Sequence, residues 1–463
     1  MAAHAAKKPQ PGADTFRRWN EIAINASGLD HTPVAPGEDR VFGEQIGPCR
    51  ASRAMAIVHI AMFDAMNSVG RKYKGYTDLR APRGPLSMQA ALSQAAHDTL
   101  TNLFPSQKAT FAARLAEDLE EVKNLRGAKR RGIRLGERAA AKILALRAWD
   151  GSAHPEPQMG TVHPTSIMPG RWRQDPISQI PIALGAKWGA CNMFVLDFAA
   201  QFRAPRPPLL ESPEYAVAYD EAKRLGGDGV VTPTERTEEQ TQTGIFWAYD
   251  GTPSLCAPPR LYNQIAMHLA DQIGTTGIEL ARLLVLANVA MAEAGTACWE
   301  SKYYWDYWRP ITGIRESDPG TGPTGSGDGN AATTGDPTYS PLGAPASNLQ
   351  GPNFTPPFPA YPSGHATFGG ALFQTLRRFY GRDDIAFTFV SDEFNGTTVG
   401  NDGNVRPLMP RSFTSLSQAE EENGQSRIYL GIHWSFDKTE GIAMGRRVGD
   451  YVFDHAFTPR RRR

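Results

Sequence analysis

Residues 277–299 read "GIELARLLVLANVAMAEAGTACW", and apolar residues recur in this run at intervals of three and four. Such spacing aligns apolar side chains along one side of an α-helix, so it predicts a core helix. The same periodicity marks the segments 51–69, 88–104, 131–149 and 441–457. Alternating strand patterns are few, so the sequence predicts an all-α fold.

Stretches rich in proline and glycine separate the predicted helices. The clearest is "APRPPLLESPEY" at 204–215, which we interpret as the boundary between two helical bundles of the four-helix type. This boundary divides the chain into an irregular segment at 1–45, a first bundle at 46–205 and a second bundle at 206–463.

A second stretch rich in proline and glycine, at 316–360, is far longer than a connection between two helices requires. Loops of this length in compact proteins are mostly functional or disordered. The stretch runs directly into a motif that contains a histidine, at 360–370. We therefore expect the loop to serve a functional site in the second bundle.

The charge balance of the chain limits its partners. Among 463 residues, 49 are Lys or Arg and 48 are Asp or Glu, so the formal net charge is only +1. This balance gives no overall field toward nucleic acid or an anionic membrane, so we expect no nucleic-acid partner and only local anion sites. Four scattered cysteines form no CxxC pair, which argues against a thiolate zinc site and a disulfide framework.

The N-terminal residues "MAAHAAKKPQPGADTF" (1–16) lack the apolar core of a secretion signal. We also find no run that approaches the length of about 18 apolar residues that a membrane helix needs. The sequence therefore predicts neither a secretion signal nor a membrane span.

The first candidate site motif is "AYPSGHATFGG" at 360–370. If Ser363 caps a helix, the free amides of Gly364 and His365 point out of the helix N-terminus, where anions bind. His365 would then lie beside the anion as a proton donor or acceptor. Alternatively, Ser363 is only a cap, His365 lies on the surface, and the small residues serve close helix packing.

The second motif is "KYYWDYWRP" at 302–310. On one helix Lys302 and Arg309 share a face, and Pro310 marks the helix end, so two cations could reach one site. Alternatively, Asp306 links both cations in a solvated salt-bridge ladder. Six aromatic residues between 299 and 308 argue against a wholly exposed helix.

The third motif is "SRIYLGIHWSFD" at 426–437. Arg427 can bind an oxyanion through its planar guanidinium, and His433 offers a ring nitrogen as ligand or nucleophile. Asp437, four residues later, could hold the other ring nitrogen and fix the tautomer. Alternatively, the histidine and its carboxylate are a buried structural pair.

Taken in order, the three motifs resemble the signature shared by vanadium-dependent haloperoxidases and the type 2 phosphatidic acid phosphatase superfamily. The resemblance implies a fold of two helical bundles with the oxyanion at one end of the second. It implies that His433 bonds the vanadium and that His365 is the acid–base residue. The residues implied to hold the vanadate oxygens are Lys302, Arg309, Ser363, Gly364 and Arg427.

For a haloperoxidase, the resemblance implies that halide is oxidised by hydrogen peroxide to hypohalous acid, which halogenates small organic acceptors, with Lys302 polarising the peroxide. For an acid phosphatase, it implies that His433 forms a phosphohistidine at the same site. Phosphatases of this superfamily are shorter or carry membrane spans, so we favour the haloperoxidase. A third alternative is a helical protein that only binds phosphate or sulfate, either of which would also fit the site without vanadate.

Further positions resemble fungal vanadium chloroperoxidases. The segment 241–266 resembles one in which the equivalent of Asp250 pairs with the equivalent of Arg427. Trp299 and Phe358 resemble the residues beside the halide. Because bromide and iodide are easier to oxidise than chloride, we expect bromide oxidation and leave chloride open. The chain is shorter than the fungal and algal enzymes, so their assembly does not transfer to it, and a homo-oligomer stays open. Because hypohalous acid is reactive, we expect export from the cytoplasm.

Overall fold

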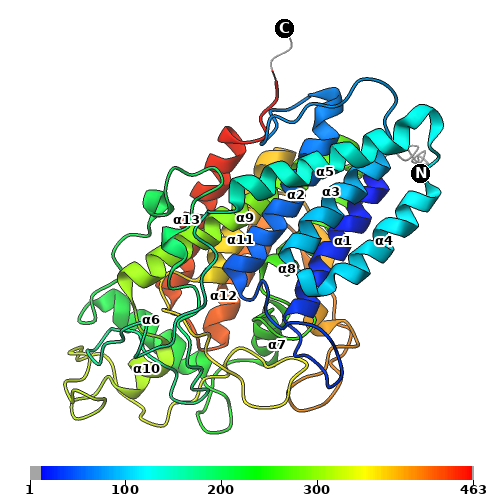
Figure 1. Cartoon of the computed structure of the whole chain (residues 1–463). Coiled ribbons are helices and arrows are strands. Elements are labelled where there is room, and N and C mark those ends of the chain that lie inside the picture. Colours follow the sequence, from blue (N-terminus) through cyan, green and yellow to red (C-terminus); the bar gives the residue numbers. More distant parts are fainter. Residues whose placement is uncertain (1–11, 461–463) are drawn as a thin grey trace, which may run out of the picture.

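The computed structural model describes residues 12–460. Within this range there are thirteen α-helices and one two-stranded antiparallel sheet, which confirms the predicted all-α class (Figure 1). The helices are α1 (Ala13–Asp30), α2 (Pro48–Gly70), α3 (Met88–Leu103), α4 (Lys108–Glu121), α5 (Ala128–Arg147), α6 (Pro213–Gly226), α7 (Glu238–Phe246), α8 (Pro259–Ile273), α9 (Gly277–Trp305), α10 (Pro310–Arg315), α11 (Gly364–Tyr380), α12 (Leu416–Tyr429) and α13 (Ser435–His455). The strands are β1 (Phe387–Phe389) and β2 (Arg411–Phe413).

Helix α9 is the centre of the molecule (Figure 1). It packs against α2 on one side and against α11 and α13 on another, and nearly all of its residues from Leu280 to Trp299 are buried. By length and composition it is the one helix among the described residues that could cross a membrane. Its most apolar window is entirely buried inside the protein, which is what a core helix of this composition requires.

The two groups of helices share one core. Helices α1 to α5 lie together on one side of α9, and α11, α12 and α13 lie together on the other (Figure 1). One hydrophobic cluster runs without a break from Phe16 in α1 to Phe457 after α13. The predicted boundary at 205/206 therefore does not separate two cores, because α9 contributes to both groups.

The predicted irregular segment at 1–45 is wrong where α1 forms. Phe16 and Trp19 of α1 are fully buried, and the Trp19 indole donates a hydrogen bond to Asp118 at 2.7 Å. The pattern is hard to find in the sequence because small and polar residues, such as Ser27 and Asn20, also face the core of this helix. Residues 31–45 are irregular as expected, and residues 1–11 lie outside the described range.

The prediction that one helix carries both Lys302 and Arg309 is also wrong. Helix α9 ends at Trp305, and Asp306 adopts a left-handed conformation with φ 50°. Arg309 is extended and precedes α10, so Pro310 begins a helix instead of ending one. Proline fits the first turn of a helix because its fixed φ is helical and its missing N–H needs no partner there.

The long loop is confirmed as a segment without helix or strand between α10 and α11. In the last part of this loop, the backbone of Ala344 pairs with that of Phe354 in an isolated antiparallel bridge, so residues 344–354 form a hairpin-like turn. Nine residues between Ala346 and Phe358 line the cavity described below. The loop thus contributes directly to the site, as its position before the histidine motif predicted.

Candidate active site

The N-terminus of α11 is built as predicted. Ser363 caps the helix, and Gly364 and His365 form its first turn. The alternative explanation of the small residues holds for the next turn, because a Cβ at Gly370 would lie 2.7 Å from the carbonyl oxygen of Ile442 in α13. A Cβ at Gly364 would instead lie 3.1 Å from the Trp299 ring, within the site itself.

His365 is buried rather than on the surface. Its Nε2 lies 2.6 Å from the carbonyl oxygen of Ala248 and 3.8 Å from a carboxylate oxygen of Asp250. Because a carbonyl can only accept, Nε2 carries the hydrogen and Nδ1 is left as the basic nitrogen. Burial, and next the positive charge of Arg427, hold the pKa of His365 well below its usual value, so the ring is neutral.

His433 has the opposite tautomer. Its Nδ1 donates to Asp437 Oδ2 at 2.8 Å, as the four-residue spacing predicted. Its Nε2 therefore carries a lone pair, which accepts a hydrogen bond from Arg309 Nη1 at 3.0 Å. Burial, and next the charge of Arg309, lower the pKa of His433 well below its usual value. A neutral ring whose Nε2 carries no hydrogen is the form that ligates a metal.

Lys302 and Arg309 are held by backbone carbonyls, although a turn separates them along the chain. Lys302 Nζ donates to the carbonyl oxygens of Pro359 and Ala360 at 2.8 and 2.9 Å. Arg309 donates to the carbonyl oxygens of Phe358 and Ile432 at 2.9 and 2.8 Å. Both cations are buried, so the alternative of a solvated ladder through Asp306 is wrong. Burial lowers the pKa of Lys302 to about 7 and that of Arg309 to about 9.

Arg427 has donors without partners. Its Nη2 donates to both carboxylate oxygens of Asp250, at 2.8 and 2.9 Å. Its Nε and Nη1 are buried and make no hydrogen bond within the described residues. Buried donors that lack acceptors are costly, and charged donors most of all. The two free N–H groups mark the place where an oxyanion would bind.

These groups fit vanadate. The site offers three cationic side chains, the N-terminus of α11 and one imidazole lone pair, which suits a tetrahedral oxyanion better than a bare cation. Accordingly, residues 12–460 contain no cluster of three or more histidine, cysteine or carboxylate ligands. The absence of a side chain at Gly364 lets the Trp299 ring lie close to the backbone of the site.

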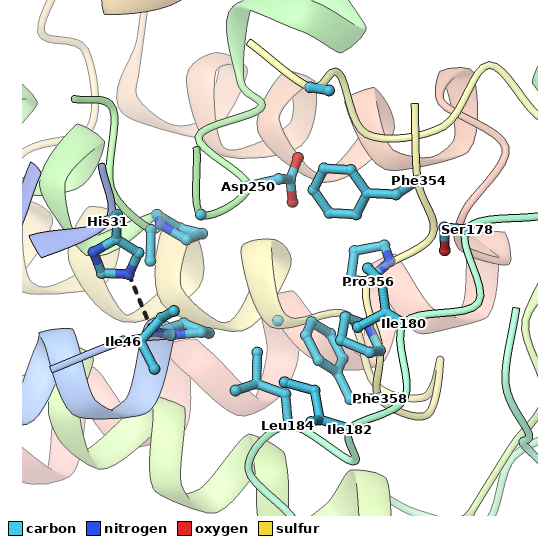
Figure 2. Close-up of a pocket in the computed structure, with 18 of the residues that line it drawn as sticks. His31, Ile46, Ser178, Ile180, Ile182, Leu184, Asp250, Phe354, Pro356 and Phe358 are labelled. Carbon is cyan, nitrogen blue, oxygen red and sulfur yellow. Dashed lines mark hydrogen bonds between the residues drawn. The ribbon is translucent and has the colours of Figure 1, made fainter. Parts of the chain in front are cut away.

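A cavity of about 490 Å³ opens onto this site (Figure 2). Of the predicted site residues, its lining includes Asp250, Gly364, His365, Arg427 and His433, together with Trp299 and Phe358. The rings of Trp299 and Phe358 are in contact, with centroids 4.8 Å apart. The remaining predicted residues, Lys302, Arg309, Ser363 and Asp437, lie behind the lining.

Sequence reasoning missed the residues that support His365 and Asp250. The buried carboxylate of Glu393 accepts hydrogen bonds from the Tyr249 amide at 3.1 Å and the Ser347 hydroxyl at 2.6 Å, and pairs with Arg406. Tyr249 has φ 45°, an unfavourable conformation that this network holds. The turn at 248–250 supplies both the acceptor for His365 and the partner of Arg427.

A second support holds the backbone of His365. The Tyr262 hydroxyl and the Asn423 side-chain amide donate to its carbonyl oxygen at 2.9 and 3.0 Å. Neither residue lies in a motif with His365, and only the folded chain brings the three together. No short-range pattern in the sequence could have identified them.

Comparisons with known proteins agree with this geometry. Residues 282–461 match the family model of the second helical-bundle domain of vanadium chloroperoxidase (VCPO). The match includes all three motifs and begins inside α9. The chain is also 30% identical to vanadium chloroperoxidase from Curvularia inaequalis over 502 residues, which covers 90% of this chain and 78% of that protein.

Two solved structures share the fold. A bacterial vanadium-dependent iodoperoxidase superimposes with a TM-score of 0.74 at 22% identity, over 99% of this chain and 100% of that one. The holo form of a bacterial vanadium-dependent chloroperoxidase gives 0.67 at 16% identity, over 97% and 98% of the two chains. With its site geometry and its long match to the fungal protein, this chain belongs to the vanadium-dependent haloperoxidase family.

Proposed function

We propose that this protein oxidises bromide and iodide with hydrogen peroxide to hypohalous acid, which halogenates organic acceptors. The observation that carries the proposal is the pair of unpartnered Arg427 donors in the same site as His433, whose Nε2 carries a lone pair. In this proposal His433 bonds vanadium, and Lys302, Arg309, Arg427, Ser363 and the Gly364 amide hold the oxygens. When bound, vanadate supplies Lewis-acid activation of peroxide without a change of oxidation state.

In this proposal His365 moves the protons of the reaction. Its neutral ring takes a proton at Nδ1, while Nε2–H stays bonded to the Ala248 carbonyl. Asp250 lies 3.8 Å from Nε2, so its negative charge stabilises the imidazolium that forms. Because Asp250 also pairs with Arg427, it connects the acid–base group to the oxyanion-binding group.

The halide would approach along the aromatic pair of Trp299 and Phe358. Lys302 Nζ lies 5.5 and 5.0 Å from the centroids of these rings, so a cation faces the apolar surface. Large, weakly hydrated anions lose less on leaving water for such a surface than small ones. This difference in hydration supports bromide and iodide as substrates. Oxidation of chloride requires its own assay.

The test is bromination of a cyclic diketone dye by the purified protein freed of bound anions. Bromide and peroxide are supplied, orthovanadate is titrated in, and phosphate is then added as a competitor. We expect turnover that depends on vanadate and is suppressed by phosphate. Hydrolysis of an aryl phosphate without peroxide, with no bromination at any vanadate concentration, would instead identify an acid phosphatase. We further propose export from the cytoplasm, which fractionation of the native cells would check.

A further inference from the structure

The cavity above the oxyanion site has two chemically different ends. The ionisable lining residues of the oxyanion site, Asp250, Arg427, His365 and His433, all have buried side chains and form the inner end of the cavity. The remaining lining is almost wholly aliphatic, aromatic or proline, and its central members are Ile46, Ile180, Ile182, Leu184, Phe354 and Pro356. Figure 2 shows these side chains around the open space, with Leu184, Ile182 and Phe358 across from Asp250.

Hydrogen bonds between loops build this apolar wall in advance. The Leu184 amide donates to the Pro357 carbonyl at 3.0 Å, which joins the segment 177–184 to the end of the long loop. The Gly47 amide donates to His31 Nε2 at 3.0 Å, and His31 Nδ1 lies 2.8 Å from the Ser27 carbonyl. Both nitrogens of His31 are therefore taken by backbone groups. A preformed wall binds a ligand without the cost of ordering loops.

The size of the cavity exceeds what the inorganic reactants need. Its volume of about 490 Å³ lies within the range of small-molecule sites, about 300–1,000 Å³. Ile180, Ile182, Leu184 and Phe354 are each only partly buried, so apolar surface faces the cavity. Covering such surface with an apolar molecule is favourable. Apart from His31, whose ring nitrogens both lie against backbone groups, the lining outside the oxyanion site has no ionisable side chain.

We propose that the outer end binds a neutral, apolar, electron-rich organic acceptor, such as an alkylated phenol, and that halogenation occurs there rather than in free solution. This inference rests on the proposed function. In the step, the O–X bond of hypohalous acid breaks and a C–X bond forms on the acceptor. The proton displaced from that carbon and the released hydroxide make water.

The first test measures binding without vanadate or halide. Thymol is titrated into the anion-free protein by calorimetry, with 4-hydroxybenzenesulfonate as the charged comparison. The variant Ile182→Asp places a charge in the wall and should weaken thymol binding by about tenfold or more. Ile180→Trp fills the space and should weaken it as well. The matched control is Ile167→Asp, at a site 59% exposed outside the cavity, which should bind thymol like the parent.

Equal thymol affinity in all four proteins, or equal binding of the sulfonate, would overturn the acceptor site. Far-ultraviolet circular dichroism of each variant establishes that the helices are retained. Ile180→Trp adds volume but no charge. If it weakens thymol binding as Ile182→Asp does, the loss comes from the occupied cavity and not from local unfolding around a buried charge.

The second test uses the vanadate-loaded enzyme and compares the ortho-to-para ratio of brominated thymol with that from reagent hypobromous acid. We expect a different ratio for the parent and a return to the reagent ratio in Ile182→Asp. The reagent ratio in the parent would overturn the proposal. Triiodide formation from iodide and peroxide, measured without an acceptor, should be unchanged in Ile182→Asp. If the parent forms no triiodide, the proposed function itself is wrong. This outcome does not depend on whether thymol binds, so the two proposals can fail separately.

Discussion

Substitutions in the ion pair of Arg427 and Asp250 should affect anion affinity and the free energy of unfolding differently. Replacing Arg427 by Met keeps the length of the side chain and removes two buried donors that have no protein partner. A hydrogen bond to a charged group contributes about 1.5–3 kcal/mol, so losing two costs about 3–6 kcal/mol of anion binding. The dissociation constant for vanadate or phosphate should rise by about 10²- to 10⁴-fold.

The same change leaves Asp250 buried without its cation. Removing one partner of a buried ion pair costs about 3–5 kcal/mol of stability. Burial already raises the pKa of Asp250, and Arg427 is the main group that lowers it, so Arg427→Met raises it further. A raised carboxyl pKa destabilises the fold above the pKa of the unfolded state. The loss of stability should therefore shrink as the pH falls.

The double variant Arg427→Met, Asp250→Asn removes both charges. It should recover most of the free energy of unfolding, measured by urea denaturation, while anion affinity, measured by calorimetry, stays as weak as in the single variant. Anion affinity within threefold of the parent in the double variant would refute the assignment of the free guanidinium donors to the oxyanion.

Three further changes test other parts of the site. His365→Ala should lower kcat for bromination by about 10²- to 10⁴-fold while the vanadate dissociation constant changes little, and a parallel loss of binding would contradict its role as a proton carrier. Burial lowers the pKa of Lys302 to about 7, so the side chain is charged below pH 7 and mostly neutral above it. Sulfate, whose charge is constant in this range, should therefore bind more tightly below pH 7. Lys302→Met should abolish this pH dependence of the sulfate affinity, measured by calorimetry. Glu393→Gln should loosen the turn at Tyr249 that holds Ala248 and Asp250, and should therefore lower kcat and shift its pH profile. Lower stability with an unchanged pH profile would show that Glu393 is purely structural.

Short-range patterns explain why much of the site was predictable. The Ser363 cap and the bond between His433 and Asp437 depend on residues at most four apart, where helix geometry fixes the outcome. The pairing of Asp250 with Arg427 spans 177 residues and was reached only through family resemblance.

The failures have physical causes as well. A left-handed residue at Asp306 ended α9 where the aromatic pattern continued, yet Lys302 and Arg309 still met because the long loop supplies carbonyls to both. Glu393 and the cavity wall lie in segments without helical or strand periodicity, where no local rule predicts which side chains meet. Helix α1 was missed because Ser and Asn occupy part of its buried face.

The position of α9 also determines how the protein comes apart. Its last two turns carry Trp299 and Lys302, while its middle packs between the N-terminal helices and α11. A chain divided at 205/206 would leave this apolar helix with one flank open to water, so neither half is a self-sufficient folding unit. We therefore expect an anion bound at one end of α9 to stabilise both groups of helices: at an anion concentration 100 times the dissociation constant, the gain in the free energy of unfolding is about 2.7 kcal/mol.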